Sequence, residues 1–170
     1  YSWIENKKIF KDEEVNNAIA QMLYHSSNDA TSFIVDLLSG TTSGTSLEGD
    51  IYSKWKYKRG IINNWLRDLN WEELKEFNCC QKTWEDSPYG REKDFYGASN
   101  ENRNAMTTDG TARIMEEIMK NLKYHENNIN IKICLHRSLN QKSLKKDPNN
   151  QIEGFLGEGL PKDKYIWSKA

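Results

Sequence analysis

The stretch LYHSSNDATSFIVDLL (residues 23–38) places a polar junction, HSSN, between two apolar patterns with helical spacing. The first pattern begins after Asp12, a residue suited to capping a helix, and the second ends at Gly40, a residue type that commonly follows a helix. We therefore expect two helices separated by a short turn. Ser26 or Ser27 can cap the second helix, and the same turn can also present side chains to a cleft.

The composition describes a very polar chain with balanced charge. Its 170 residues are 36% hydrophobic, and 24 Lys and Arg oppose 25 Asp and Glu, for a net charge of −1. Mean hydropathy is −0.88. Since no segment is strongly basic, we expect no nucleic-acid partner. A length of 170 residues fits one domain, so residues 1–170 are expected to form a single domain. No apolar run is long enough to span a bilayer, and no signal-peptide pattern is present.

Further helices and loops are predicted beyond the junction. Apolar spacing predicts helices around residues 61–69 and 114–122, the second capped by Thr108 or Asp109. Residues 39–50 and 81–106 are predicted as loops, and the length of the second is typical of functional loops.

Three further predictions concern short segments, either where an element begins or whether it is a helix or a strand. Asn70 and Glu73 resemble a capping box at the start of WEELKEF. Residues 129–139 fit a strand or a helix, because isoleucines alternate there while other apolar residues keep helical spacing. The closing KYIWSK is predicted as a strand from its aromatic and β-branched residues.

Ser26, Ser27 and Asn28 match the Ser-x-Asn form of the second motif of penicillin-recognising serine enzymes. The segment GEGLPKDKYIWSKA (residues 157–170) resembles the part of class A β-lactamases in which Gly-Leu-Pro precedes a strand ending in Lys-Thr-Gly. Here that tripeptide would begin with Lys169, and Ala170 replaces the threonine.

Two internal segments resemble the same enzymes. NAMTTDGTARIMEEIM (residues 104–119) is similar to the helix start after their Ω-loop, and the lead-in to that loop is similar to residues 62–86. Glu85, after an aromatic residue, falls at the position of the deacylation glutamate, and Glu92 is a second candidate. Neither is followed four residues later by the family's asparagine. The matches run in order along nearly the whole chain, which is identified as resembling the serine β-lactamase and penicillin-binding-protein superfamily, closest to class A-like serine hydrolases.

This resemblance implies an α/β fold of the β-lactamase/transpeptidase type, of which this chain would form mainly the helical lobe and the start of a sheet strand. It also implies an acyl-enzyme reaction on a β-lactam or a D-Ala-D-Ala-like amide, including a peptidoglycan peptide, and a periplasmic or secreted location. In this acyl-enzyme reaction, Ser26 would relay a proton and Asn28 would bind the substrate's amide. Lys169 would attract the substrate's carboxylate, and Glu85 would orient water.

The nucleophile of such a reaction would belong to a Ser-x-x-Lys motif. The motif occurs at Ser53–Lys56 and Ser143–Lys146, but both pairs lie in polar sequence predicted as loop or linker. In the resembling family the motif opens a buried helix well before Ser-x-Asn. We therefore expect the nucleophile to precede Tyr1 and the chain to be a fragment truncated at both ends.

Metal and histidine chemistry is not indicated. His25, His125 and His136 lack a metal-ligand spacing, and the adjacent pair Cys79 and Cys80 has no further ligands nearby in sequence, so we expect no zinc and no cofactor. The odd number of cysteines argues against a disulfide framework. Neighbours such as His25 and Ser26 usually point apart, which argues against a Ser-His pair.

Two alternatives remain open. The Lys-Ala ending and the glutamate without its asparagine also fit a non-catalytic module that binds peptidoglycan or another ligand, with aromatic and asparagine side chains lining its cleft. In a third interpretation, HSSN only caps a helix of an interaction domain.

Overall fold

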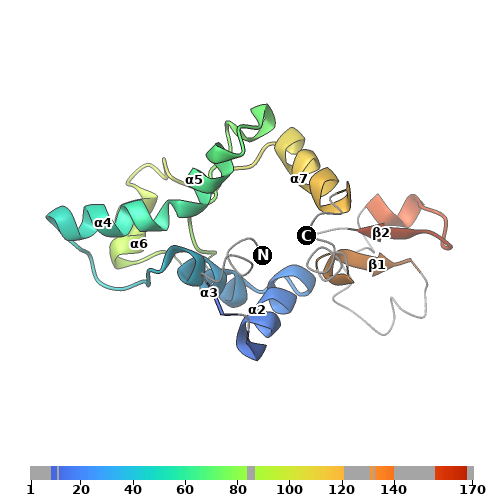
Figure 1. The fold of residues 1–170 in the computed structure, drawn as a ribbon, viewed down its shortest axis with the longest axis horizontal. Coiled ribbons are helices and arrows are strands. Elements are labelled where there is room, and N and C mark those ends of the chain that lie inside the picture. Colours follow the sequence, from blue (N-terminus) through green and yellow to red (C-terminus); the bar gives the residue numbers. More distant parts are fainter. Residues whose placement is uncertain are drawn as a thin grey trace.

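The computed structural model describes residues 9–10, 12–83, 87–120, 131, 133–139 and 156–167. Its regular structure is mainly helical (Figure 1). The helices and strands in chain order are α2 (Glu13–Tyr24), α3 (Asn28–Ser39), α4 (Gly49–Arg59), α5 (Ile61–Asp68), the 3₁₀ turn η1 (Glu72–Leu74), α6 (Gly90–Tyr96), α7 (Thr108–Lys120), β1 (His136–Ser138), the 3₁₀ turn η3 (Leu156–Gly159) and β2 (Tyr165–Trp167).

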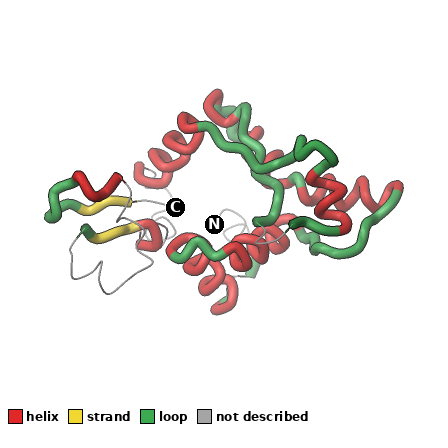
Figure 2. The backbone as a smooth tube through the Cα atoms, turned by 180° about the vertical axis from the view of Figure 1, so that it is seen from behind, coloured by secondary structure: helices red, strands yellow, loops and turns green. Residues whose placement is uncertain are grey.

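The α/β fold class implied by the resemblance is wrong. Within the described residues the single sheet has two antiparallel strands, in which His136 lies opposite Trp167. Strands of three residues cannot form a layer that helices cover, so the helices instead pack on one another. The sheet lies at the end of the long axis opposite α4 and α6 (Figures 1 and 2). The predicted strand near the C-terminus is confirmed over Tyr165–Trp167.

Helices α2 and α3 form as predicted, and their caps explain where each begins. Asp12 Oδ1 accepts a hydrogen bond from the Val15 amide at 2.9 Å, and Ser27 Oγ accepts one from the Ala30 amide at 3.2 Å. Ser27, rather than Ser26, is therefore the cap of α3. Gly40 ends α3 in the left-handed conformation, with φ of 59°.

Ser26 turns the chain between these two helices. Its φ of 56° is in the left-handed region that residues with a side chain rarely adopt. The Gln21 carbonyl accepts the amides of His25 and Ser27, each at 3.1 Å, and so closes the end of α2. The HSSN junction is thus a real interruption, held in a strained backbone conformation.

Helix α4 was not predicted, because Lys54, Lys56 and Lys58 interrupt any apolar stripe along it. One aromatic side chain anchors it instead. Trp55 is 7% exposed, its Nε1 donates to the Thr42 carbonyl at 3.0 Å, and its ring meets Phe95 edge-on at 5.5 Å.

The Ser-x-x-Lys match on α4 lies on a helix, not in the predicted loop or linker. Ser53 and Lys56 are nevertheless exposed, and Ser53 Oγ donates to the Gly49 carbonyl of the same helix at 3.2 Å. In the serine β-lactamase superfamily the nucleophile lies at the start of a buried helix, whereas Ser53 and Lys56 are exposed. Ser143 and Lys146 lie outside the described residues.

Several helix and strand boundaries in the structure differ from the predicted ones. Asn70 does not form a capping box; it has a φ of 53°, and only the short turn η1 follows. Thr107, not Thr108 or Asp109, caps α7, since its Oγ1 accepts the Gly110 amide at 3.1 Å. In the ambiguous stretch 129–139, residues 131 and 133–135 are helical and 136–138 form β1, so both patterns are realised in part.

A buried ionic cluster joins α3, α4 and α6. Arg59 and Glu92 are each 0% exposed and form an ion pair, and Arg59 Nη2 also lies 2.8 Å from Asp36 Oδ1. Glu92 Oε1 accepts a further hydrogen bond from Ser43 at 2.9 Å. The cluster fixes α6 against α3 and α4, so this short helix can form one rigid wall of a pocket.

Candidate functional site

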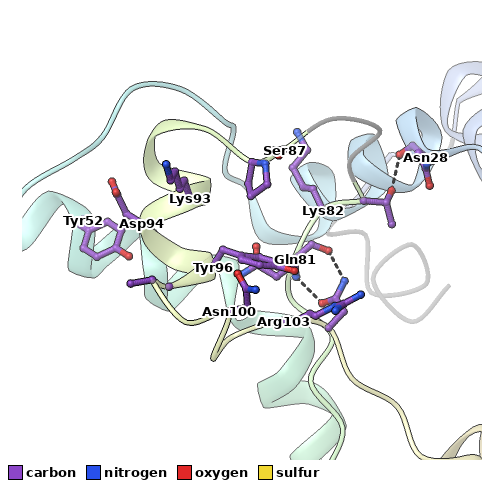
Figure 3. A pocket seen from close by; sticks show the side chains of 15 residues that line it. Asn28, Tyr52, Gln81, Lys82, Ser87, Lys93, Asp94, Tyr96, Asn100 and Arg103 are labelled. Atoms are coloured by element: carbon purple, nitrogen blue, oxygen red, sulfur yellow. Dashed lines mark hydrogen bonds between the residues drawn. The ribbon is translucent and has the colours of Figure 1, made fainter.

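An open pocket of about 1080 Å³ lies beside the N-terminal end of α3 (Figure 3). Its walls come from the start of α3, from α4, from α6 and from two irregular segments. The lining residues are Asn28, Tyr52, Gln81, Lys82, Thr83, Ser87, Pro88, Lys93, Asp94, Tyr96, Gly97, Ala98, Asn100, Arg103 and Asn104. The predicted long loop 81–106 thus provides most of the walls, although part of it forms α6.

Two hydrogen bonds attach this loop to α3. Thr83 Oγ1 donates to the Asn28 carbonyl, and Ser32 Oγ donates to the Thr83 carbonyl, each at 2.9 Å. The first bond joins residues 55 positions apart in sequence. It brings the Ser-x-Asn turn next to the segment that leads into Glu85 in the sequence.

Asn104 holds the opposite side of this segment. Its Oδ1 accepts the amides of Cys80 and Gln81 at 3.1 and 2.9 Å, and its Nδ2 donates to the Gln81 carbonyl at 2.9 Å. One carboxamide therefore satisfies three backbone groups of a segment that lies between regular elements. Residues 80–83 are fixed from both sides as a result.

Lys82 connects the pocket to the ionic cluster. Its Nζ lies 2.8 Å from Asp36 Oδ2 and 3.0 Å from Ser43 Oγ, and its side chain is 13% exposed. Asp36 also pairs with Arg59. The pocket wall and the buried cluster are thus one connected network, in which Asp36 balances part of the positive charge of Lys82.

The remaining charges of the pocket lie near its rim. Lys93, Asp94 and Arg103 are exposed lining residues that come from α6 and from the segment after it. Burial, and then the negative charge of Asp94, raise the pKa of Tyr52 above its usual value, so the Tyr52 hydroxyl stays protonated at neutral pH.

Gln81 is the least expected member of the lining. It is 3% exposed, and within the described part of the chain neither Oε1 nor Nε2 has a hydrogen-bond partner. A buried carboxamide of this kind is normally paired with protein, ordered water or a ligand. Its position in the lining of this pocket makes it a candidate for contact with a bound molecule.

Replacing Gln81 with leucine is expected to raise the free energy of unfolding by about 1 kcal/mol, because it removes a desolvated polar group that makes no hydrogen bond to the described residues. The measurement is urea denaturation, with Gln21→Leu on the exposed face of α2 as the control. A loss of stability in Gln81→Leu would show instead that the carboxamide is already satisfied in the folded protein.

The structure places some of the predicted site residues relative to the pocket, and others lie outside the described residues. Asn28 lines the pocket, whereas Ser26, two residues earlier, is half-buried in the strained turn and is not among the lining residues. Glu85 and Lys169 lie outside the described residues. The expected meeting of Ser26, Asn28 and Lys169 around one pocket therefore stays a prediction.

Glu92, the second candidate for the deacylation base, is wrong for that role. Its side chain is fully buried and paired with Arg59, so it cannot hold a water molecule against a substrate. No sequence pattern indicated this pairing, since Arg59 lies 33 residues earlier in a helix that was not predicted.

The cysteines do not form a reactive centre in the described residues. Cys79, Cys80 and Cys134 are not in disulfides, and burial raises the pKa of Cys80 to about 11. A thiol with so high a pKa is a poor nucleophile at neutral pH. The described ranges also hold no cluster of three His, Cys, Asp or Glu side chains that could bind a metal ion, and none of their helices could cross a membrane.

Comparison of the chain with known protein families, with curated proteins and with solved structures gives no match.

Proposed function

We propose that this chain contributes to a serine acyl-hydrolase site of the β-lactamase and penicillin-binding type, which acts on β-lactam or D-Ala-D-Ala-like amides through an acyl-enzyme. The observation that carries the proposal is the hydrogen bond from Thr83 to Asn28. It joins two of the sequence segments that carry the resemblance, and Asn28 lines a pocket large enough for a drug-sized ligand.

The proposed roles follow from the side chains. Asn28 offers both a donor and an acceptor, as recognition of a substrate amide requires. The hydroxyl of Ser26 would pass a proton to the leaving nitrogen, and Glu85 would orient the water that releases the acyl group. The strained backbone at Ser26 supports a functional turn, because such strain is concentrated at active sites and binding sites.

The second candidate is a non-catalytic module that binds peptidoglycan or a related ligand. One observation favours it: Asn28 and several other carboxamides line the pocket, while Ser26 does not. A pocket of this kind can bind an amide without a proton relay at its surface.

Covalent labelling by a fluorescent penicillin tests the proposal, and nitrocefin hydrolysis tests turnover. Both use the natural gene product that contains this chain. Asn28→Ala is expected to slow labelling by about 10- to 100-fold, the value of one or two hydrogen bonds to a buried polar ligand. Asn17→Ala, at an exposed position of α2, is the matched control and should label normally.

Each outcome separates the candidates. Labelling that depends on Asn28 supports the acyl-enzyme. Reversible binding of penicillin without a covalent adduct favours the binding module, and the absence of both contradicts the two proposals together.

A further inference from the structure

The charge of the pocket differs from that of the chain as a whole. Three lining residues are cationic, Lys82, Lys93 and Arg103, and Asp94 is the one acidic residue among the lining residues that the structure describes. The chain itself has a net charge of −1. The positive character of the pocket is therefore local and does not follow from the composition.

Two of these cations form no ion pair within the described part of the chain. Lys82 is balanced by Asp36, but within these ranges no ion pair involves Lys93 or Arg103. Their side chains are exposed at the pocket, on α6 and on the segment after Asn100, respectively (Figure 3). An unbalanced ammonium and guanidinium at the rim of one concave site attract anions.

The position of Asn28 indicates which part of a substrate would meet these cations. If Asn28 binds the amide of the acyl side chain, the groups beyond that amide extend into the rest of the same pocket. Its other neutral polar groups include the buried carboxamide of Gln81 and the side chains of Asn100 and Asn104. Among the described lining residues, Lys93 and Arg103 are the cations that lack an acidic partner.

We infer that the pocket selects amides whose acyl side chain carries a carboxylate, with Lys93 and Arg103 as the residues that determine this specificity. The inference rests on the proposed function, since it uses Asn28 to fix the direction of the ligand. It adds the charge of the substrate side chain, which neither the proposed reaction nor the sequence motifs determine.

Three penicillins with one skeleton provide the test. Penicillin G has an unsubstituted benzyl side chain, carbenicillin has an added α-carboxylate, and ampicillin, with its α-amine protonated, carries the opposite charge at the same carbon. The second-order rate constant of acylation of the natural gene product is measured for each at low ionic strength. We expect carbenicillin to react about fivefold faster than penicillin G, and ampicillin to react more slowly, as one solvent-exposed charge contact allows.

Two variants assign the effect to residues. Arg103→Gln and Lys93→Gln should each reduce the ratio of carbenicillin to penicillin G, and the double variant should bring it close to one. Lys75→Gln removes the same charge from an exposed side chain outside the pocket and should leave the ratio unchanged. Added salt should lower the ratio in the unmodified protein and in Lys75→Gln, because exposed charges are screened.

The outcomes distinguish this inference from the proposed function. Equal acylation rates for the three compounds, or ratios that the two variants leave unchanged, would overturn the inference while the acyl-enzyme stands. If no adduct forms, the dissociation constants of the same compounds are measured by isothermal titration calorimetry. A preference for carbenicillin that Arg103→Gln removes would then support the inference without catalysis, whereas equal affinity or no binding would refute it.

Discussion

Arg59→Ala is expected to lower the free energy of unfolding by about 3–5 kcal/mol, the range for removal of one partner from a buried ion pair. The guanidinium is fully buried and contacts two carboxylates, of Glu92 and Asp36. Its loss leaves the buried side chain of Glu92 without its ion-pair partner, and the pairing between α4 and α6 is lost with it. Urea denaturation followed by circular dichroism measures the change.

Two further variants test whether the loss of stability in Arg59→Ala comes from breaking the buried ion pair. The double variant Arg59→Leu with Glu92→Leu should recover most of the lost stability, since apolar replacement of a buried pair is often neutral. This recovery is favoured because Arg59 Nε and Glu92 Oε2 make no hydrogen bond in the described residues. Arg67→Ala, on the exposed surface of α5, should change stability by less than about 1 kcal/mol. An Arg59→Ala protein as stable as Arg67→Ala would contradict the buried cluster.

If the proposed acyl-hydrolase function is right, the combined substitution Ser32→Ala and Thr83→Val should reduce turnover of nitrocefin by about 100-fold, because it releases from α3 the segment that leads into Glu85. Both hydroxyls donate across this contact, and a displacement of about 1 Å in a catalytic group can reduce the rate by that factor. Acylation should change less than turnover, since the expected role of Glu85 is in deacylation. The burst of labelling followed by slow turnover is measured by stopped-flow absorbance.

Hydroxyls with purely local bonds provide the control for this pair. Ser53 donates to Gly49 within α4, and Thr111 donates to Thr107 at the start of α7. The combination Ser53→Ala with Thr111→Val removes the same chemical groups from exposed helix surfaces and should leave turnover unchanged. Equal turnover in both double variants would mean that the contact between Thr83 and α3 has no role in the reaction.

The helices could be predicted where polar caps and apolar spacing agree. Asp12 and Gly40 delimit α2 and α3 because each acts within its own helix turn. Helix α4 escaped prediction because its buried contacts come from Trp55 and Arg59, whose partners lie far away in the sequence. The expectation of an α/β fold failed for a different reason. It was transferred from a resemblance, and within the described residues the one sheet consists of β1 and β2.

The site could be predicted only where a short motif exists. Asn28 was identified from Ser-x-Asn, and it lines the pocket. Gln81, Lys93 and Arg103 belong to a segment without periodicity, where no local pattern indicates which side chain faces a cavity. Their grouping depends on tertiary hydrogen bonds such as those of Asn104, which sequence spacing does not reveal. For these three residues, the length of the predicted loop was the one available indication of function.

The most direct test of the central claim is intact-mass spectrometry of the natural gene product after exposure to penicillin G, followed by peptide mapping of the adduct. If the turn at Asn28 and the segment at Thr83 belong to an acyl-transfer site, the mass should increase by one penicillin on a serine of a Ser-x-x-Lys motif, and Asn28→Ala should slow the increase. An unchanged mass, or an adduct whose formation Asn28→Ala and Asn17→Ala affect equally, would contradict the claim.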